Sequence, residues 1–86
     1  MERFRGTITR GTEAWNVEGV LTVSQDIRGG LEDWRGAFKD PGGTSLSPGQ
    51  EWKLTLKEGR CGRVVLKRLN ANSDGLARWE FERAGD

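Results

Sequence analysis

Basic side chains gather around a short turn in the second half of the chain. Arg60, Arg63, Lys67 and Arg68 follow one another closely there. With Trp15, which begins an alternating stretch beside a loop, they form our candidate binding surface. Small barrels use cations interleaved with aromatic residues to hold single-stranded nucleic acid. The competing interpretation is a solvated face, because glutamates are interspersed with these cations and opposite charges on neighbouring strands stabilise each other.

Charge alone does not make this chain a nucleic-acid binder. It carries 14 basic and 13 acidic residues, a net charge of +1, whereas domains that bind nucleic acid by charge usually have a marked basic excess. A local patch stays possible, since Arg3, Arg5 and Arg35 add a second group of outward cations. The balance therefore limits any nucleic-acid interface to one part of the surface.

The residue types that catalysis needs are scarce. Histidine is absent, which removes the commonest general base and the commonest transition-metal ligand. Cys61 is the single cysteine and has no histidine to activate it. The polar segment 70–75 imitates the first half of a calcium-binding EF-hand loop, but its twelfth position is Phe81 and no helix is expected beside it. We expect a protein that is not an enzyme, with no metal site and no cofactor.

Four tryptophans are many for 86 residues, and all four share the parity of the apolar residues around them. We expect them to fill the core of a small domain. The alternative is a tryptophan-lined mouth that holds a small ligand or a sugar. Trp15 is the best candidate for partial exposure, because it starts its stretch beside a loop.

Apolar and polar residues alternate in six short stretches, and turn residues bound each of them. Alternation of this kind predicts strands with one buried face, which is typical of antiparallel sheets. No stretch shows a sustained helical period. We predict one antiparallel all-β domain over residues 1–86, a closed or half-open barrel of about six strands, because closure hides sheet edges. The expected strands are residues 3–9, 15–24, 32–39, 51–57, 63–69 and 76–83.

Three glycines interrupt the inward faces of these strands. Gly6, Gly19 and Gly36 each stand where an apolar residue is expected. Such positions usually mark bulges or sharp bends, which a barrel needs at its corners. Val20 is the opposite exception, an apolar residue on an outward face.

Two connections carry clear turn signals. Pro48-Gly49 is the signature of a type II turn, and Glu58-Gly59-Arg60 predicts a tight hairpin. The longest loop, between residues 39 and 51, contains Leu46, which we expect to attach that loop to the core.

A chain with one cysteine forms no internal disulfide, which fits a reducing compartment, so we expect a cytoplasmic protein. The first ten residues lack the apolar region of a signal peptide, and no apolar run is long enough for a membrane helix, so no membrane partner is expected. The sequence does not determine the function. Our best hypothesis is an interaction module that binds a protein partner or a second copy of itself, with single-stranded nucleic acid or a small ligand as alternatives.

Overall fold

The computed structural model describes residues 2–25, 32–42, 46–71 and 75–84. Six antiparallel strands account for most of them, and this described part contains no helix. The predicted all-β class and the number of strands are confirmed. The strands are β1 (Glu2–Arg10), β2 (Glu13–Gln25), β3 (Glu32–Lys39), β4 (Glu51–Leu56), β5 (Cys61–Ala71) and β6 (Ala77–Arg83).

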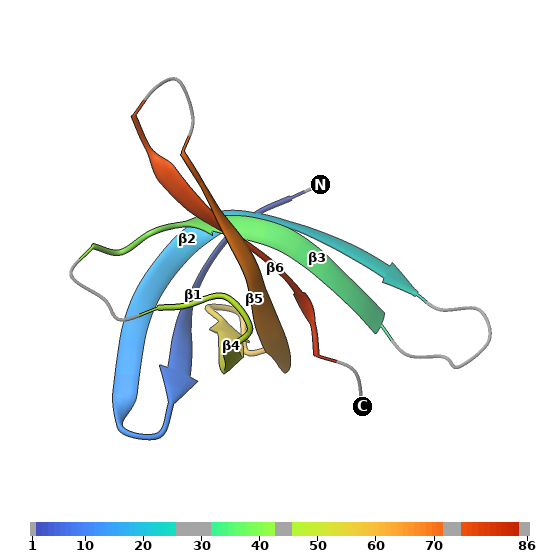
Figure 1. Ribbon diagram of the computed structural model, residues 1–86. Helices are drawn as coiled ribbons and strands as arrows, with labels where there is room; N and C mark the ends of the chain where they lie inside the picture. The colour runs from blue at the N-terminus through green and yellow to red at the C-terminus, as the bar shows by residue number, and fades with distance from the viewer. Residues whose placement is uncertain (1, 26–31, 43–45, 72–74, 85–86) are drawn as a thin grey trace.

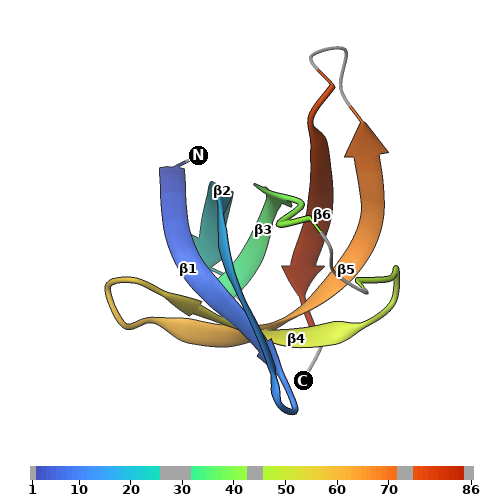
Figure 2. The ribbon, with the colours of Figure 1, turned by 90° about the vertical axis from the view of Figure 1, so that its left-hand side faces the viewer.

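The sheet closes into a barrel with the strand order β1-β2-β3-β6-β5-β4, in which β4 pairs with β1 (Figure 1). The chain runs β1-β2-β3 as a meander and then crosses to the far side of the barrel. β5 bends strongly, because its first half pairs with β4 and its second half pairs with β6 (Figure 2). Of the two predicted forms, closed or half-open, the barrel is closed, because every strand has a paired neighbour on both sides.

The interior is built from the apolar residues of the six alternating stretches. It contains no buried polar or charged residue among those the structure describes. Burial of these side chains is the main favourable contribution to folding. The buried cluster consists of Phe4, Ile8, Val17, Leu21, Trp34, Phe38, Trp52, Leu54, Leu56, Val64, Leu66, Trp79 and Phe81.

The tryptophans follow the predicted parity. Trp34, Trp52 and Trp79 are almost completely buried, whereas Trp15 is half-buried and packs against the edge of the cluster. The expectation of core-filling tryptophans with partial exposure at Trp15 is therefore confirmed.

The inward glycines allow neighbouring backbones to approach closely. A Cβ atom on Gly19 would lie 1.9 Å from the carbonyl oxygen of Ala37, and one on Gly36 would lie 2.1 Å from that of Val20. Strand pairing continues without a register shift through Gly6, Gly19 and Gly36, so the bulge alternative is wrong for all three. The register shift that does occur is in β5, between Leu66 and Arg68.

Both predicted turns are present. Gln50 N donates to Ser47 O at 3.3 Å, and Gly49 has a φ of 88°, as a type II turn requires. The β4–β5 hairpin closes through a 2.7 Å hydrogen bond from Leu56 N to the carbonyl oxygen of Arg60. Leu46 is half-buried and packs against the core as expected.

Strand ends differ from the prediction mainly in β5, which runs from residue 61 to 71 rather than from 63 to 69. The extra residues are polar or small, but they are paired: Asn70 with Arg78 and Ala71 with Ala77. Backbone pairing, which leaves no mark on side-chain alternation, extends the strand. The predicted loop 26–30 and residues 72–74 of the calcium-like segment 70–75 lie outside the described residues.

Candidate functional site

The structure separates the five residues of the predicted binding surface. Trp15 lies inside one end of the barrel, opposite Ile8. Arg60 belongs to the β4–β5 turn, and Arg63 lies near the start of β5. Lys67 and Arg68 lie further along β5, at and after its register shift.

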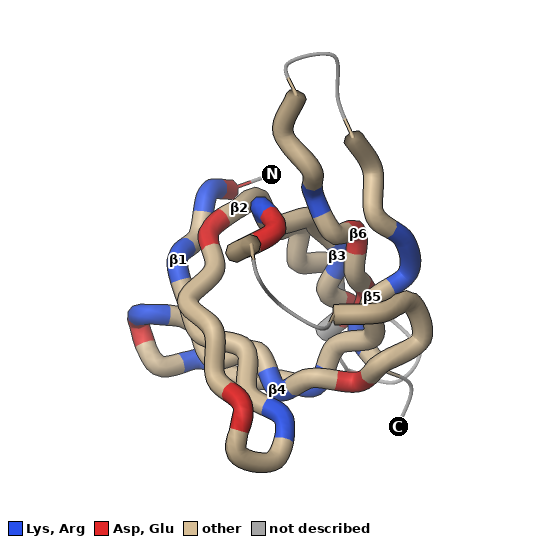
Figure 3. Tube along the Cα trace, turned by 60° about the vertical axis from the view of Figure 1, so that its left-hand side comes forward, with Lys and Arg blue, Asp and Glu red and all other residues tan. Residues whose placement is uncertain are grey.

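Each of the four predicted cations faces a carboxylate. Arg68 Nε is 2.8 Å from Glu80 Oε2, Lys67 Nζ is 3.0 Å from Glu82 Oε1, and Arg63 is 3.9 Å from Glu51. Arg60 pairs with Glu58 and, at 3.3 Å, with Glu2. Figure 3 shows the two signs of charge interspersed around the barrel. This arrangement favours the solvated-face interpretation of these residues.

Two of these arginines are held more firmly in the charged form by their partners. A hydrogen bond from the Arg68 guanidinium to Glu80 raises the pKa of Arg68 above its ordinary value. The pKa of Arg60 is raised mainly by its hydrogen bond to Glu58. Both side chains are exposed, so these pairs order the surface and do not bury a charge.

Among four hollows on the described surface, none contains more than two of the five predicted residues. Lys67 and Arg68 line a hollow of 720 Å³ over β3 and β6, where Glu80 and Glu82 balance them. Arg60 lines a smaller hollow of 170 Å³. Trp15 and Arg63 line none of the four, so no one of these hollows brings the five predicted residues together.

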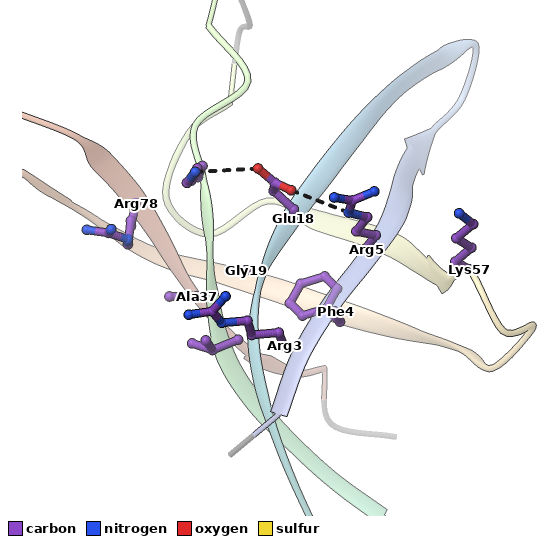
Figure 4. Close-up of a pocket in the computed structure, with 10 residues that line it drawn as sticks. Arg3, Phe4, Arg5, Glu18, Gly19, Ala37, Lys57 and Arg78 are labelled. Atoms are coloured by element: carbon purple, nitrogen blue, oxygen red, sulfur yellow. Dashed lines mark hydrogen bonds and ion pairs between the residues drawn. The ribbon is translucent and has the colours of Figure 1, made fainter.

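A different hollow, over the outer face of β1, β2 and β3, gathers cations in excess. Its volume is 690 Å³, and it is lined by five cations and one acid (Figure 4). We call it the cationic hollow. Its lining residues are Arg3, Phe4, Arg5, Glu18, Gly19, Val20, Ala37, Lys39, Lys57 and Arg78.

The floor of the cationic hollow is apolar and low. Val20 on β2 faces Ala37 on β3, and both are half-buried on the outside of the barrel. Gly19 adds only backbone, and Phe4, 9% exposed, contributes to the wall. The small side chains keep the floor below the long arginines and lysines around it.

The single acid of the hollow is shared between two cations. Glu18 Oε2 lies 3.6 Å from Arg5 Nε, and Glu18 Oε1 lies 3.4 Å from Lys39 Nζ. Arg3 and Lys57 form no ion pair with any residue that the structure describes. Arg3 extends from β1 across β2 toward Ala37 (Figure 4). Arg3 and Lys57 therefore give the hollow positive charge that no described carboxylate pairs with.

A second hollow, of 670 Å³, shares four residues with the cationic hollow and continues it along the barrel. Thr7 and Asn16 line it as well, and their side chains are joined by a 3.2 Å hydrogen bond. The outer face of β1 and β2 thus offers one extended depression. The shared residues are Arg5, Glu18, Lys39 and Lys57.

The end of the β5–β6 hairpin projects beyond the barrel as an arm (Figures 1 and 2). Leu69 and Leu76 are exposed on it, at 46% and 43%. They are separate leucines and not a continuous apolar face, and single exposed apolar residues are common on protein surfaces.

The sequence pointed to part of the cationic hollow. Arg3 and Arg5 belong to the second group of outward cations, and Val20 was the apolar residue on an outward face. Lys39 and Arg78 were not singled out, because they come together only where β3 pairs with β6 in the barrel. The signal available in the sequence was a pair of apolar residues, Val20 and Ala37, on the outward faces of two consecutive strands.

The described residues hold no group of three or more histidine, cysteine, aspartate or glutamate side chains arranged to bind a metal ion. Among those same residues, none forms a helix long and apolar enough to cross a membrane. Comparison of the chain with protein-family models, with curated proteins and with solved structures yields no match.

Proposed function

We propose that this protein is a non-enzymatic binding module, a small closed barrel that recognises a protein partner through its outer surface. The observation that carries the proposal is the extended depression over β1 and β2, with its apolar floor and its charged rim. Charged residues around an apolar centre are usual at protein–protein contacts. The interior, by contrast, is filled by apolar side chains, and no polar or charged residue is buried there among those the structure describes.

The closed sheet favours contact through side chains and loops over strand addition. Strand addition needs an exposed sheet edge, and in this barrel each strand has a paired neighbour on both sides. We also propose a cytoplasmic location, because Cys61 is exposed and is the single cysteine of the chain.

Single-stranded nucleic acid is a second candidate, because the cationic hollow could contact phosphates. Binding of single strands also relies on aromatic side chains on which bases stack. The large apolar residues exposed on the described surface are leucines, and no tryptophan lines the four hollows. The same absence of tryptophan weakens support for a sugar site.

The proposal is tested by capture on immobilised full-length protein from a lysate of its native cell, with and without nuclease. Bound proteins are eluted with an excess of untagged protein and identified by mass spectrometry. We expect a small set of proteins that survives nuclease and that the untagged chain displaces. Capture that nuclease abolishes would favour nucleic acid, and the absence of any displaceable protein would overturn the proposal.

Self-association is measured separately by sedimentation velocity over a wide range of concentrations. If a second copy is the partner, the sedimentation coefficient rises with concentration. A constant value for a single chain assigns recognition to a different protein.

A further inference from the structure

We infer that the cationic hollow is the docking site and that its ligand is an acidic peptide segment, in which carboxylates alternate with small apolar side chains. This inference rests on the proposed function and adds the location of the site and the chemistry of the partner. The juxtaposition that carries it is an excess of cations around the low apolar floor of Val20 and Ala37.

Charge complementarity fixes the sign of the ligand. Five cations and one acid line the hollow, although the chain as a whole has a net charge of only +1. The predicted cations on the β4–β5 hairpin and on β5, by contrast, are all matched by glutamates. Complementary charges steer association and select partners more than they add affinity.

Two cations are available without breaking a bond inside the protein. Arg3 and Lys57 make no ion pair with the described residues, and both are exposed. Arg5 and Lys39 share one carboxylate, that of Glu18, and so keep donors for a ligand. Arginine in particular binds carboxylates through two parallel hydrogen bonds.

The floor and Glu18 favour a peptide over a nucleic acid. Val20 and Ala37 provide contact area for small aliphatic side chains, and they offer no aromatic ring for a base to stack on. Glu18 is a hydrogen-bond acceptor in the rim, and a peptide backbone brings N–H donors to it. A phosphodiester backbone brings only acceptors and negative charge, which Glu18 repels.

An extended segment fits the shape of the site. The cationic hollow and the 670 Å³ hollow that continues it follow β1 and β2 along the outside of the barrel. In an extended peptide, successive side chains point to opposite sides, so apolar residues at every second position can face the floor. The carboxylates between them then face outward and to the sides, where the long arginine and lysine side chains reach them.

The experiment measures binding of a fluorescein-labelled peptide of about eight residues, with alternating Asp and Val, by fluorescence anisotropy. We expect saturable binding whose Kd rises at least about threefold when ionic strength increases from about 0.05 M to about 0.3 M. The comparison probes are a peptide with Lys in place of Asp and an oligothymidylate of similar length. Neither is expected to bind as tightly.

The matched variants are Arg3→Glu/Lys57→Glu and Arg10→Glu/Lys53→Glu. Each double variant replaces one exposed arginine and one exposed lysine, and each changes the net charge by the same amount, from +1 to −3. The second pair lies outside the four hollows. We expect the first variant to weaken peptide binding at least about tenfold and the second to change it about threefold or less. Circular dichroism of each variant verifies the barrel.

The inference would be overturned if the two double variants lost the same amount of peptide affinity. It would also be overturned if the wild-type protein did not bind the acidic peptide. Tighter binding of the oligothymidylate would overturn it in favour of nucleic acid. Its failure is distinguishable from failure of the proposed function. If the Arg3→Glu/Lys57→Glu protein still captures the nuclease-resistant partners, the binding module stands and its site lies elsewhere.

Discussion

Gly19 is the position where a single methyl group should damage this barrel most. A Cβ atom there would lie 1.9 Å from the carbonyl oxygen of Ala37 and 2.6 Å from the Cα atom of Phe38. An ordinary contact begins near 3.4 Å, so the two backbones would have to separate by 3.4 − 1.9 = 1.5 Å. That movement is opposed from both sides, because β2 is also paired with β1 and β3 is also paired with β6.

Gly19→Ala should remove a substantial part of the free energy of unfolding of the domain. Overpacking costs about 1–3 kcal/mol, and loosening the β2–β3 hydrogen bonds adds about 1 kcal/mol. The lower entropy of an unfolded alanine returns about 0.4–1 kcal/mol. The net loss is about 1–3.5 kcal/mol, from a free energy of unfolding of about 5 kcal/mol for a domain of this size.

Urea unfolding followed by tryptophan fluorescence measures the loss. With a slope of about 1 kcal/mol per molar urea, the midpoint of Gly19→Ala should fall by about 1–3.5 M. Gly62→Ala is the matched control, because the nearest atoms to its Cβ would belong to the Trp34 ring, from 3.4 Å, which is an ordinary contact. We expect its free energy of unfolding to change by less than about 1 kcal/mol. If the two variants unfold at the same urea concentration, close approach of the β2 and β3 backbones is not the reason for glycine at position 19.

Three further predictions concern the hydrogen bonds of Gln50, the ion pair of Lys67 and the buried tryptophans. Gln50 Oε1 accepts hydrogen bonds from Ser47 N at 3.0 Å and from Trp52 Nε1 at 3.2 Å, so Gln50→Leu should lower the free energy of unfolding by about 1–3 kcal/mol, whereas Gln50→Glu, which keeps the acceptor, should lose less. Lys67→Ala breaks an exposed ion pair with Glu82, and thermal melts should show a loss below about 1 kcal/mol. Because three of the four tryptophans are at most 4% exposed, native fluorescence should be blue-shifted and only weakly quenched by acrylamide; strong quenching would contradict the buried core.

Side-chain alternation was sufficient to predict the strands and their inward faces. Phe4, Ile8, Trp52 and Leu54 are buried as their parity requires, and the boundaries of β3 match the prediction. Alternation works here because each strand has one face in the core and one in solvent, so burial repeats with a period of two. It says nothing about which strands are neighbours. The order β1-β2-β3-β6-β5-β4 depends on how the meander closes, and no local pattern encodes it.

The candidate site failed to emerge from the sequence for that same reason. Arg60, Arg63, Lys67 and Arg68 are close along the chain, but β5 bends between β4 and β6 and distributes them over different surfaces. Lys39 and Arg78, by contrast, are far apart in sequence and become direct neighbours where β3 pairs with β6. Clustering of charge in a barrel is decided by pairing across strands, which a reading along the chain cannot recover.

Gly19 connects the stability of this barrel to its outer surface. Its inward side lies so close to the β3 backbone that no side chain fits, and its outward side belongs to the cationic hollow. The neighbouring Val20 and Ala37 face each other across the same pair of strands and form the floor. Any change that separates β2 from β3 therefore also moves the two halves of that floor apart. Substitutions at Gly19 should weaken acidic-peptide binding even under conditions where the variant is fully folded, whereas Gly62→Ala should leave it unchanged. Peptide anisotropy well below the unfolding transition measures this coupling, and unaltered affinity in a folded Gly19→Ala protein would show that the hollow does not depend on the close approach of these strands.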